Sequence, residues 1–415
     1  MIIWNATKNY YSTMFKKITF LANNFYTLLV LIAIVNMLWG KDLYSFVLLI
    51  IGICGFFSLK QLRLQSVDFL VLAYIGYMLI SYLWSTNPYL FYLGMKEELM
   101  PIFFYFMARD MKFTDGKFIK NMWWPMLFAF ACGIYLWWRP PGWYLDFRIN
   151  RDLTWLSDER TFEVTRLSSF WTWSYFVGYS SLILLMYFIH RFVFYGEKVK
   201  CFWIGIAITI IAMLLAQQRS SIAFFALYMT ALMGYGVIKG KVAGKHVFYF
   251  GLSSIAIIGI FIFFITQYVG SEYVEFVLSR FESTDHSLVT ERYNQFSDQL
   301  VYFTFLGGGM GTFGHSAFAY DLPCSADNDY FRIILAYGIP GTLILMLILF
   351  ATIKNGLRNI YENFFYLSCV GFMIIAATGA DVTEKYTLQS FVWWYAIGMI
   401  QTNTLGYTHS IIEKK

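Results

Sequence analysis

The sequence predicts an all-α polytopic membrane protein with about twelve transmembrane helices. The chain of 415 residues is 59% hydrophobic and has a mean hydropathy of +0.56. Only 13% of its residues are charged, about half of the fraction that a soluble domain carries. Apolar runs of roughly 20 residues, each long enough to cross a bilayer, recur along the chain. Together these three observations place the whole chain in a membrane.

The apolar runs give the positions of the expected helices. They lie at about 18–38, 43–59, 67–85, 88–108, 121–138, 172–194, 201–217, 220–238, 247–268, 329–352, 363–380 and 386–404. We expect one transmembrane domain over 1–415 with two long outer loops, at 139–171 and 269–328. The second loop should contain short helices, because its stretch Ser287–Phe303 has apolar residues at helical spacing.

The basic residues predict the orientation and a binding function. With the N-terminus inside, most of the 31 lysines and arginines fall on the inner side, as the positive-inside rule requires. The net charge of +6 therefore reflects membrane topology and does not indicate nucleic-acid binding. The inner bases are mainly lysine, whereas the outer ones are mainly arginine: Arg139, Arg148, Arg151, Arg160, Arg166, Arg219, Arg280, Arg292 and Arg332.

The outer arginines indicate a bound anion. A guanidinium is a planar fork that grips phosphate or carboxylate with two hydrogen bonds. The alternative is that several of these arginines pair with loop carboxylates. The candidates for such pairing are Asp146, Asp152, Glu163, Glu282 and Asp298.

Two of these arginines lie next to apolar runs. Arg166 precedes the sixth helix in the polar, aromatic segment TRLSSFWTWSYFVGYSS, which fits either a sugar-facing lip or an interfacial aromatic belt. Arg219 joins two apolar runs in LLAQQRSSIAFF with almost no loop, so it should lie at the outer membrane surface. Ionisable groups there are costly and usually functional, although snorkelling to the lipid headgroups is the alternative.

The second long loop carries Arg280 and Arg292 in RFESTDHSLVTERYNQF, followed by the glycine-rich FLGGGMGTFGH. The glycines allow close backbone approach or turns with positive φ. A phosphate-binding P-loop is excluded, because no Lys-Ser/Thr follows the glycines. A plain turn and an anion-binding nest both remain open.

The segment SADNDYFRIILAYGIPG opens the tenth helix with Asp327, Asn328 and Tyr330 at its outer end. Helix capping and catalysis both explain these polar residues. Gly338 and Pro340 should kink the helix. The histidines are scattered and no HExxH motif occurs, so neither a metal site nor another cofactor is expected.

In this order, the many apolar helices, QQRSS, the loop arginines, GGGMGTFG and DNDYFRIILAYGIPG resemble the O-antigen ligase and O-antigen polymerase family of bacterial envelope glycosyltransferases. The resemblance implies a GT-C-type fold in the inner membrane, with the active site facing the periplasm. It also implies an undecaprenyl-pyrophosphate-linked donor glycan and inversion at the anomeric carbon without metal. Ligases carry His-Asn where this chain has Asp327-Asn328. This difference and TRLSSFW favour a polymerase of O-antigen or a related surface polysaccharide.

For such a reaction, the charge and position of individual residues indicate their roles. Arg219 and Arg292 would bind pyrophosphate, and Arg166 and Arg280 would hold the second lipid-linked chain or the same anion. Asp327 is the first candidate for a general base, followed by His315 and Glu98. The catalytic set is Asp327, Arg280 and His315; the binding set is Arg166, Arg219, Arg292, Asn328 and Tyr330.

Partners and alternatives follow from this assignment. Expected partners are the donor and acceptor lipid-linked glycans, membrane lipids and a chain-length regulator protein. A ligase would transfer the same glycan to lipid A core. A lipid-linked glycan flippase or transporter would need charged groups deep in its helices, whereas here the charges cluster towards the outer face.

Overall fold

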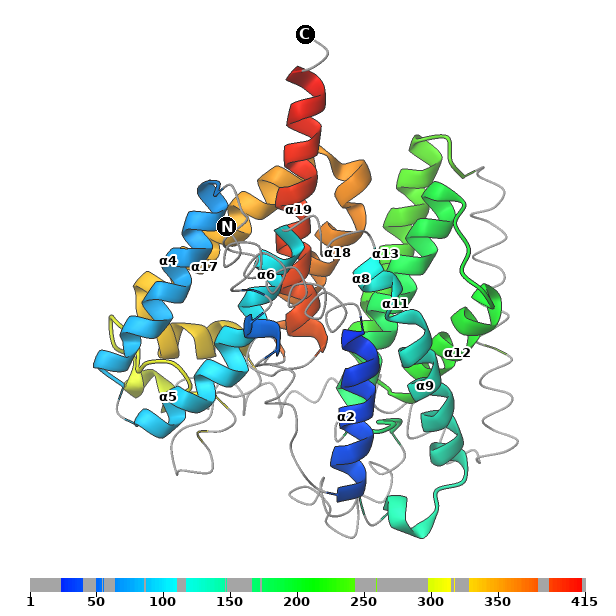
Figure 1. Ribbon diagram of the computed structural model, residues 1–415, viewed down its shortest axis with the longest axis horizontal. Coiled ribbons are helices and arrows are strands. Elements are labelled where there is room, and N and C mark those ends of the chain that lie inside the picture. The colour runs from blue at the N-terminus through cyan, green and yellow to red at the C-terminus, as the bar shows by residue number, and fades with distance from the viewer. Residues whose placement is uncertain are drawn as a thin grey trace, which may run out of the picture. The chain divides into compact units, whose positions relative to one another are not determined.

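The computed structural model describes residues 24–39, 50–53, 64–85, 87–109, 117–145, 166–171, 174–242, 298–314, 328–379 and 388–412, with single positions at 55, 147, 259 and 317. All of the regular structure in these residues is helical (Figure 1). The chain forms two compact units, one made of 1–122 and 288–415 and the other of 123–287.

Four helical segments are long and apolar enough to cross a bilayer: Ser66–Leu83, Ser174–Tyr195, Arg219–Ile238 and Asp329–Arg358. Their mean hydropathies lie between 1.5 and 2.4. This supports the prediction of a helical membrane protein. The predicted runs at 43–59 and 247–268 lie mostly outside the described residues, so the number of twelve spans stays a prediction.

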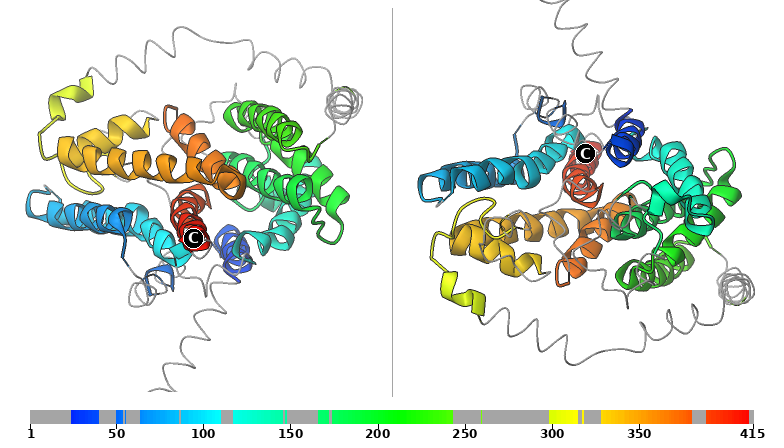
Figure 2. Two further views of the ribbon diagram at one scale, coloured as in Figure 1. Left: turned by 90° about the horizontal axis from the view of Figure 1, so that it is seen from above. Right: turned by 90° about the horizontal axis from the view of Figure 1, so that it is seen from below.

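The first unit is built around α19 (Leu388–Ile412). It packs against α6 (Met100–Arg109) and α18 (Ile360–Ala376), while α17 (Asp329–Arg358) packs along α4 (Ser66–Ile80) (Figure 2). Its other elements are α2 (Phe25–Trp39), η1 (Ser81–Leu83), α5 (Pro88–Gly94), the π-helical turn η2 (Met95–Leu99), α8 (Lys117–Lys120) and η4 (Leu300–Tyr302).

A close approach joins α6 and α19. A Cβ on Gly398 would lie 2.4 Å from the carbonyl oxygen of Tyr105. Small residues at such crossings let membrane helices pack backbone to backbone, so Gly398 sets how closely these two helices pack.

The predicted kink in the tenth helix is confirmed. Gly338 has φ 59° and ψ −163° inside α17, and Pro340 follows it. Proline has no amide hydrogen, so the carbonyl four residues earlier, that of Ala336, loses its helical partner. The helix therefore breaks into two segments whose freed polar groups need partners in a medium without water.

The glycine-rich turn supplies these partners. Gly308 N donates to Leu335 O at 2.8 Å, and Gly309 N donates to Ala336 O at 2.9 Å. In return, Ile339 N donates to Phe305 O at 3.0 Å. A side chain at Gly338 would clash with the backbone of the turn, since its Cβ would lie 2.1 Å from Phe305 O. The kink and the turn therefore require each other.

The second unit contains α9 (Trp123–Trp138), α11 (Ser174–Tyr195), α12 (Phe202–Leu215) and α13 (Arg219–Ile238). The central helix is α11, which packs against both α12 and α13. Within the unit α11 is largely buried, whereas only about a third of α13 is. This difference suits an inner helix surrounded by lipid-facing neighbours.

Candidate functional site

In the second unit, α12 and α13 are joined by only three residues, Ala216 to Gln218. The turn closes because Gln217 adopts a left-handed conformation with φ 53°, which is uncommon outside glycine. Arg219 is the first residue of α13, and its side chain is exposed. The predicted placement of this arginine at the end of two apolar helices is confirmed.

The segment 166–171 lies against the same turn. Leu167 N donates to Leu215 O at 3.0 Å, at the last residue of α12. Ser169 fixes the segment to α9, because its hydroxyl donates to Ala129 O at 2.6 Å. Tyr144 adds a hydrogen bond to the Ser169 carbonyl at 2.9 Å. These contacts bring the partly buried Arg166 to the end of the unit that carries Arg219.

Uncharged polar groups surround the turn. The Gln218 amide nitrogen lies 3.4 Å from the Tyr179 hydroxyl and 3.5 Å from the Ser220 hydroxyl. Gly178 makes room for Gln218, since a Cβ there would lie 2.6 Å from the Gln218 Cβ. Within the described residues Arg219 has no hydrogen-bond or ion-pair partner. Arg219 and the neighbouring amide and hydroxyl groups are the types of group that bind oxyanions such as phosphate, and Arg166 lies at the same end of the unit.

In the first unit, polar side chains at the N-terminal end of α17 form hydrogen bonds within the fold. The Asn328 side chain caps the helix by accepting from Phe331 N at 3.1 Å and also donates to Thr378 O at 3.3 Å. The Tyr330 hydroxyl donates to Ile374 O at 2.6 Å. The capping interpretation of Asn328 is therefore confirmed, and both residues link α17 to the end of α18.

A buried ion-pair cluster follows within one turn. Arg332 lies 2.9 Å from Glu98 Oε2 and 2.8 Å from Asp329 Oδ1. The side chains of all three are at most 4% exposed. Glu98 also accepts from Gly311 N at 3.1 Å and from the Tyr337 hydroxyl. Each Glu98 oxygen is thus occupied by a protein donor, which argues against Glu98 as the general base.

Arg332, one of the nine arginines expected on the outer side, is held in this buried ion-pair cluster. The partners that hold it in the described residues, Glu98 and Asp329, lie on helical segments. Asp329 and Arg332 are three residues apart on one helix, a spacing from which their pairing could have been predicted. Nothing near Glu98 in the sequence pointed to Arg332, because more than 200 residues separate the two.

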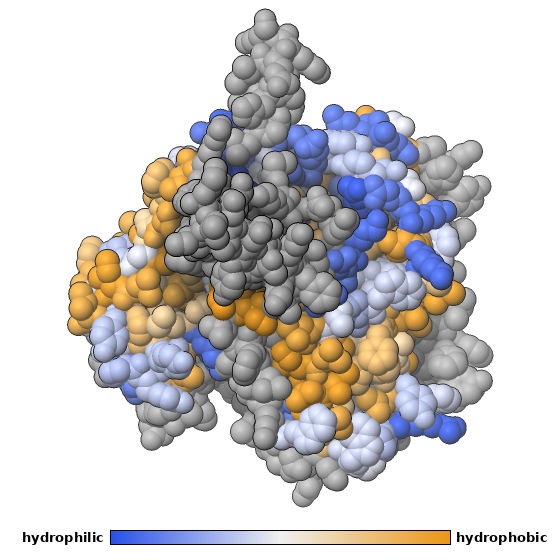
Figure 3. All heavy atoms as spheres, viewed as in Figure 1, coloured by the Kyte–Doolittle hydropathy of each residue, from blue (hydrophilic) through white to orange (hydrophobic). Residues whose placement is uncertain are grey.

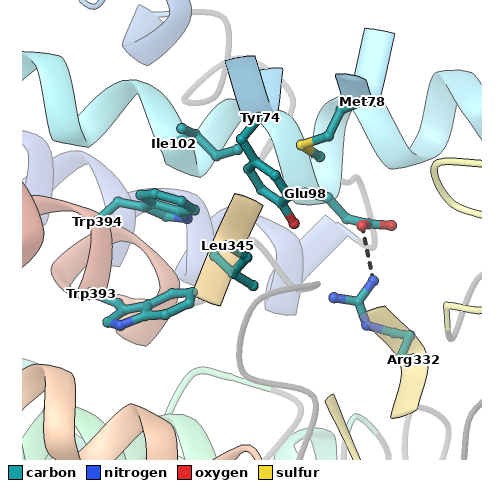
Figure 4. Close-up of a pocket in the computed structure, with 8 residues that line it drawn as sticks. All are labelled: Tyr74, Met78, Glu98, Ile102, Arg332, Leu345, Trp393 and Trp394. Atoms are coloured by element: carbon teal, nitrogen blue, oxygen red, sulfur yellow. Dashed lines mark ion pairs between the residues drawn. The ribbon is translucent and has the colours of Figure 1, made fainter. Parts of the chain in front are cut away.

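A small cavity lies beside the cluster (Figure 4). The ion pair of Glu98 and Arg332 lies on one side, and the indoles of Trp393 and Trp394 lie on the other. The cavity volume is about 10 Å³, enough for about one water. A cavity of this volume has no room for a sugar ring.

The glycine-rich turn does not form an anion nest. Its amides at Gly308 and Gly309 donate to α17, Met310 N donates to the Ser81 hydroxyl at 3.1 Å, and Gly311 N donates to Glu98. Every one of these donors already has a protein acceptor. These contacts support the plain-turn interpretation. The turn donates hydrogen bonds to the carbonyl groups that the kink in α17 leaves without helical partners.

The structure thus brings together two of the predicted site residues, Arg166 and Arg219. It places Asn328 and Tyr330 in the other unit. The remaining predictions, Arg280, Arg292, His315 and Asp327, lie outside the described residues. No group of three or more His, Cys, Asp or Glu in the described part of the chain is arranged to hold a metal ion. Comparison of the chain with protein-family models and with curated proteins finds no match.

Proposed function

We propose that the chain is a membrane glycosyltransferase that joins undecaprenyl-pyrophosphate-linked oligosaccharide repeat units into O-antigen or a related surface polysaccharide. The reaction would occur at the periplasmic face of the bacterial inner membrane, in a GT-C-like fold, with inversion and without metal. The sequence resemblance supplies this reaction class.

The observation that carries the proposal is the exposed guanidinium of Arg219 at the end of two apolar helices, with Arg166 held against the same turn. The leaving group of the reaction is a lipid pyrophosphate, which gains charge as the glycosidic bond breaks. A fixed positive group at the membrane surface stabilises that charge. Arg219 has the exposure and the position for this task, whereas the buried Arg332 does not.

The test uses purified full-length protein supplied with lipid-linked repeat units, with products separated by length. The native protein should give products longer by whole repeats. Arg219→Ala should slow their formation by about 100-fold or more, the cost of removing one such stabilising donor. Arg139→Ala is the matched control, because Arg139 is also exposed but lies over the Trp138 ring, 4.9 Å from its centre.

Several outcomes contradict the proposal. Equal rates in the Arg219 and Arg139 variants would remove the arginine assignment. Loss of activity in EDTA would show that the metal-free mechanism is wrong. Products formed only when lipid A core is added would replace the polymerase with the ligase.

A flippase or transporter is the second candidate, and one observation favours it. Glu98 lies on a π-helical turn, paired with Arg332 inside the first unit; π-turns and buried ionisable groups both occur often at functional sites of membrane proteins. A transporter would move labelled lipid-linked glycan across a sealed vesicle without lengthening it. The same purified protein can be tested for both activities.

A further inference from the structure

A second charged surface lies where α11 and α13 end and α12 begins. It carries the bases Arg191, Lys198, Lys200, Lys239 and Lys241, and the acid Glu197. The acid pairs with Arg191. We name this set the basic end of the second unit. Figure 3 shows hydrophilic residues gathered at the upper right, where Figure 1 places the ends of α11 and α13.

The last turn of α11 brings the three helix ends together. On one side Phe192 contacts Phe202 and Trp203 of α12, with ring centres 5.2 and 5.4 Å apart. On the other side Phe194 lies 5.7 Å from Tyr235 of α13. The bases that follow α11 and α13 and precede α12 therefore lie at the same end of the second unit.

Aromatic rings hold several of these bases in place. Lys198 Nζ lies 5.1 Å from the Phe192 ring centre and 5.7 Å from that of Trp203. Lys239 Nζ lies 5.6 Å from the Tyr235 ring centre. Lysine beside tryptophan or tyrosine at a helix end is typical of the membrane interface. Because the side chains rest on rings, less freedom is lost when they bind an anion.

Exposed apolar side chains adjoin the bases directly. Ile204 is 65% exposed one turn after Lys200, and Ile238 is 80% exposed immediately before Lys239. A free phosphate or an acidic peptide would use only the charges of this surface. A phospholipid would use both features, with its phosphate on the lysines and its acyl chains on the isoleucines.

From this juxtaposition we propose that the basic end of the second unit binds an anionic phospholipid. Lys198, Lys200 and Lys239 supply the positive charge that attracts its headgroup, and its acyl chains lie along α12 and α13. The site is separate from the turn that carries Arg219, which joins the opposite ends of α12 and α13. The proposal therefore does not depend on the glycosyltransferase assignment.

The experiment measures the thermal unfolding midpoint of the detergent-solubilised full chain during titration with phosphatidylglycerol. Phosphatidylcholine with the same acyl chains is the neutral-headgroup comparison. A lipid that binds the folded protein raises the midpoint, and the rise grows with the logarithm of the lipid concentration once that concentration exceeds the Kd. Phosphatidylglycerol should raise it and phosphatidylcholine should not, and the rise should shrink as ionic strength increases.

The test variant carries Lys198→Gln, Lys200→Gln and Lys239→Gln. Each lysine near an anionic lipid contributes about fivefold to affinity, so the triple variant should bind phosphatidylglycerol on the order of 100-fold more weakly. The matched control removes three exposed bases of the first unit with Lys120→Gln, Lys354→Gln and Arg358→Gln. The control should keep its affinity.

Four results would overturn the proposal. These are equal responses to the two lipids, an equal loss of affinity in the test and control variants, an equal midpoint rise with inorganic phosphate, and an equal rise with polyglutamate. If the glutamine variant does not fold, the lysine-to-arginine triple variant and the salt dependence of the native protein decide the question. A charge-preserving triple variant that loses phosphatidylglycerol binding, or a native response that salt leaves unchanged, would also contradict it.

Discussion

Replacing Arg109 by methionine should lower the free energy of unfolding of the first unit by about 3–5 kcal/mol, because it leaves a buried carboxylate without its charge partner. Arg109 Nε lies 2.9 Å from Asp68 Oδ1, and Nη2 lies 3.0 Å from Oδ2. The two side chains are 2% and 0% exposed. This is the bidentate pair that a guanidinium and a carboxylate form when they lie in one plane.

The size of this loss follows from the interactions that Asp68 keeps after the substitution. After Arg109→Met, the Asp68 carboxylate still accepts from the Tyr105 hydroxyl at 2.5 Å and from the backbone N–H of Gln65 at 2.7 Å. Two hydrogen bonds do not replace a full positive charge in a site without water. The arginine also links helices, since its Nη1 lies 3.5 Å from the Thr402 hydroxyl of α19. The loss should therefore reach the contact between α6 and α19.

Replacing both partners should recover much of the loss. In Asp68→Leu with Arg109→Met no uncompensated charge remains, and buried ion pairs exchanged for apolar pairs are often neutral or stabilising. The Tyr105 hydroxyl would be left without its acceptor, at a cost of about 1–3 kcal/mol. Adding Tyr105→Phe removes that cost, so the triple variant should be more stable than Arg109→Met alone.

The assay is reversible unfolding of the purified protein in mixed detergent micelles, followed by circular dichroism as the SDS fraction rises. The control is Glu197→Gln, which breaks the Arg191–Glu197 pair, whose side chains are 33% and 46% exposed. An exposed pair contributes about 0–1 kcal/mol. If Arg109→Met costs no more than this control, or if the double variant is less stable than Arg109→Met, the reasoning from burial is refuted.

Two further predictions concern the first unit and use the same assay. Gly311→Ala should destabilise by roughly 1–3 kcal/mol, because Gly311 has φ 78° and an added Cβ would lie 2.1 Å from Leu90 O; Gly371→Ala in α18, where nothing lies within 4 Å, is the control and should be neutral or slightly stabilising. Asn328→Ala should cost about 1 kcal/mol through loss of the helix cap, while Asn328→Asp keeps the accepting oxygen and most of the stability. Equal losses in these two Asn328 variants would show that the cap is not the cause.

Helix positions were the most predictable feature of the sequence. The predicted run at 172–194 corresponds to α11, and that at 220–238 corresponds to α13, within two residues at each end. Hydropathy succeeds here because a spanning segment must be apolar over its whole length. The kink at Gly338 and Pro340 was also predictable, since it depends on two residue types with known backbone limits.

Partners across the fold were not predictable in this way. Arg109 ends an apolar run and reads as an inner-surface base, yet it is buried against Asp68, 41 residues earlier. The glycine-rich turn allows either a nest or a plain turn by composition alone. Only its contact with Leu335 and Ala336 of the broken helix decides between them. Pairing of this kind depends on which helices become neighbours, and local sequence does not contain that information.

The same reasoning distinguishes Arg219 from Arg332 by their surroundings in the fold. Residue type alone places Arg219 and Arg332 in one class, because both lie at the start of an apolar helix on the predicted outer side. Their surroundings differ: Arg332 is 1% exposed between two carboxylates, whereas Arg219 is exposed and lies beside amide and hydroxyl groups. A guanidinium already held by two carboxylates would have to break a buried pair to bind phosphate, at a cost of several kcal/mol. Arg219 has no such pair to break within the described residues, so of these two guanidiniums it is the one that can bind an anion without losing a buried ion pair.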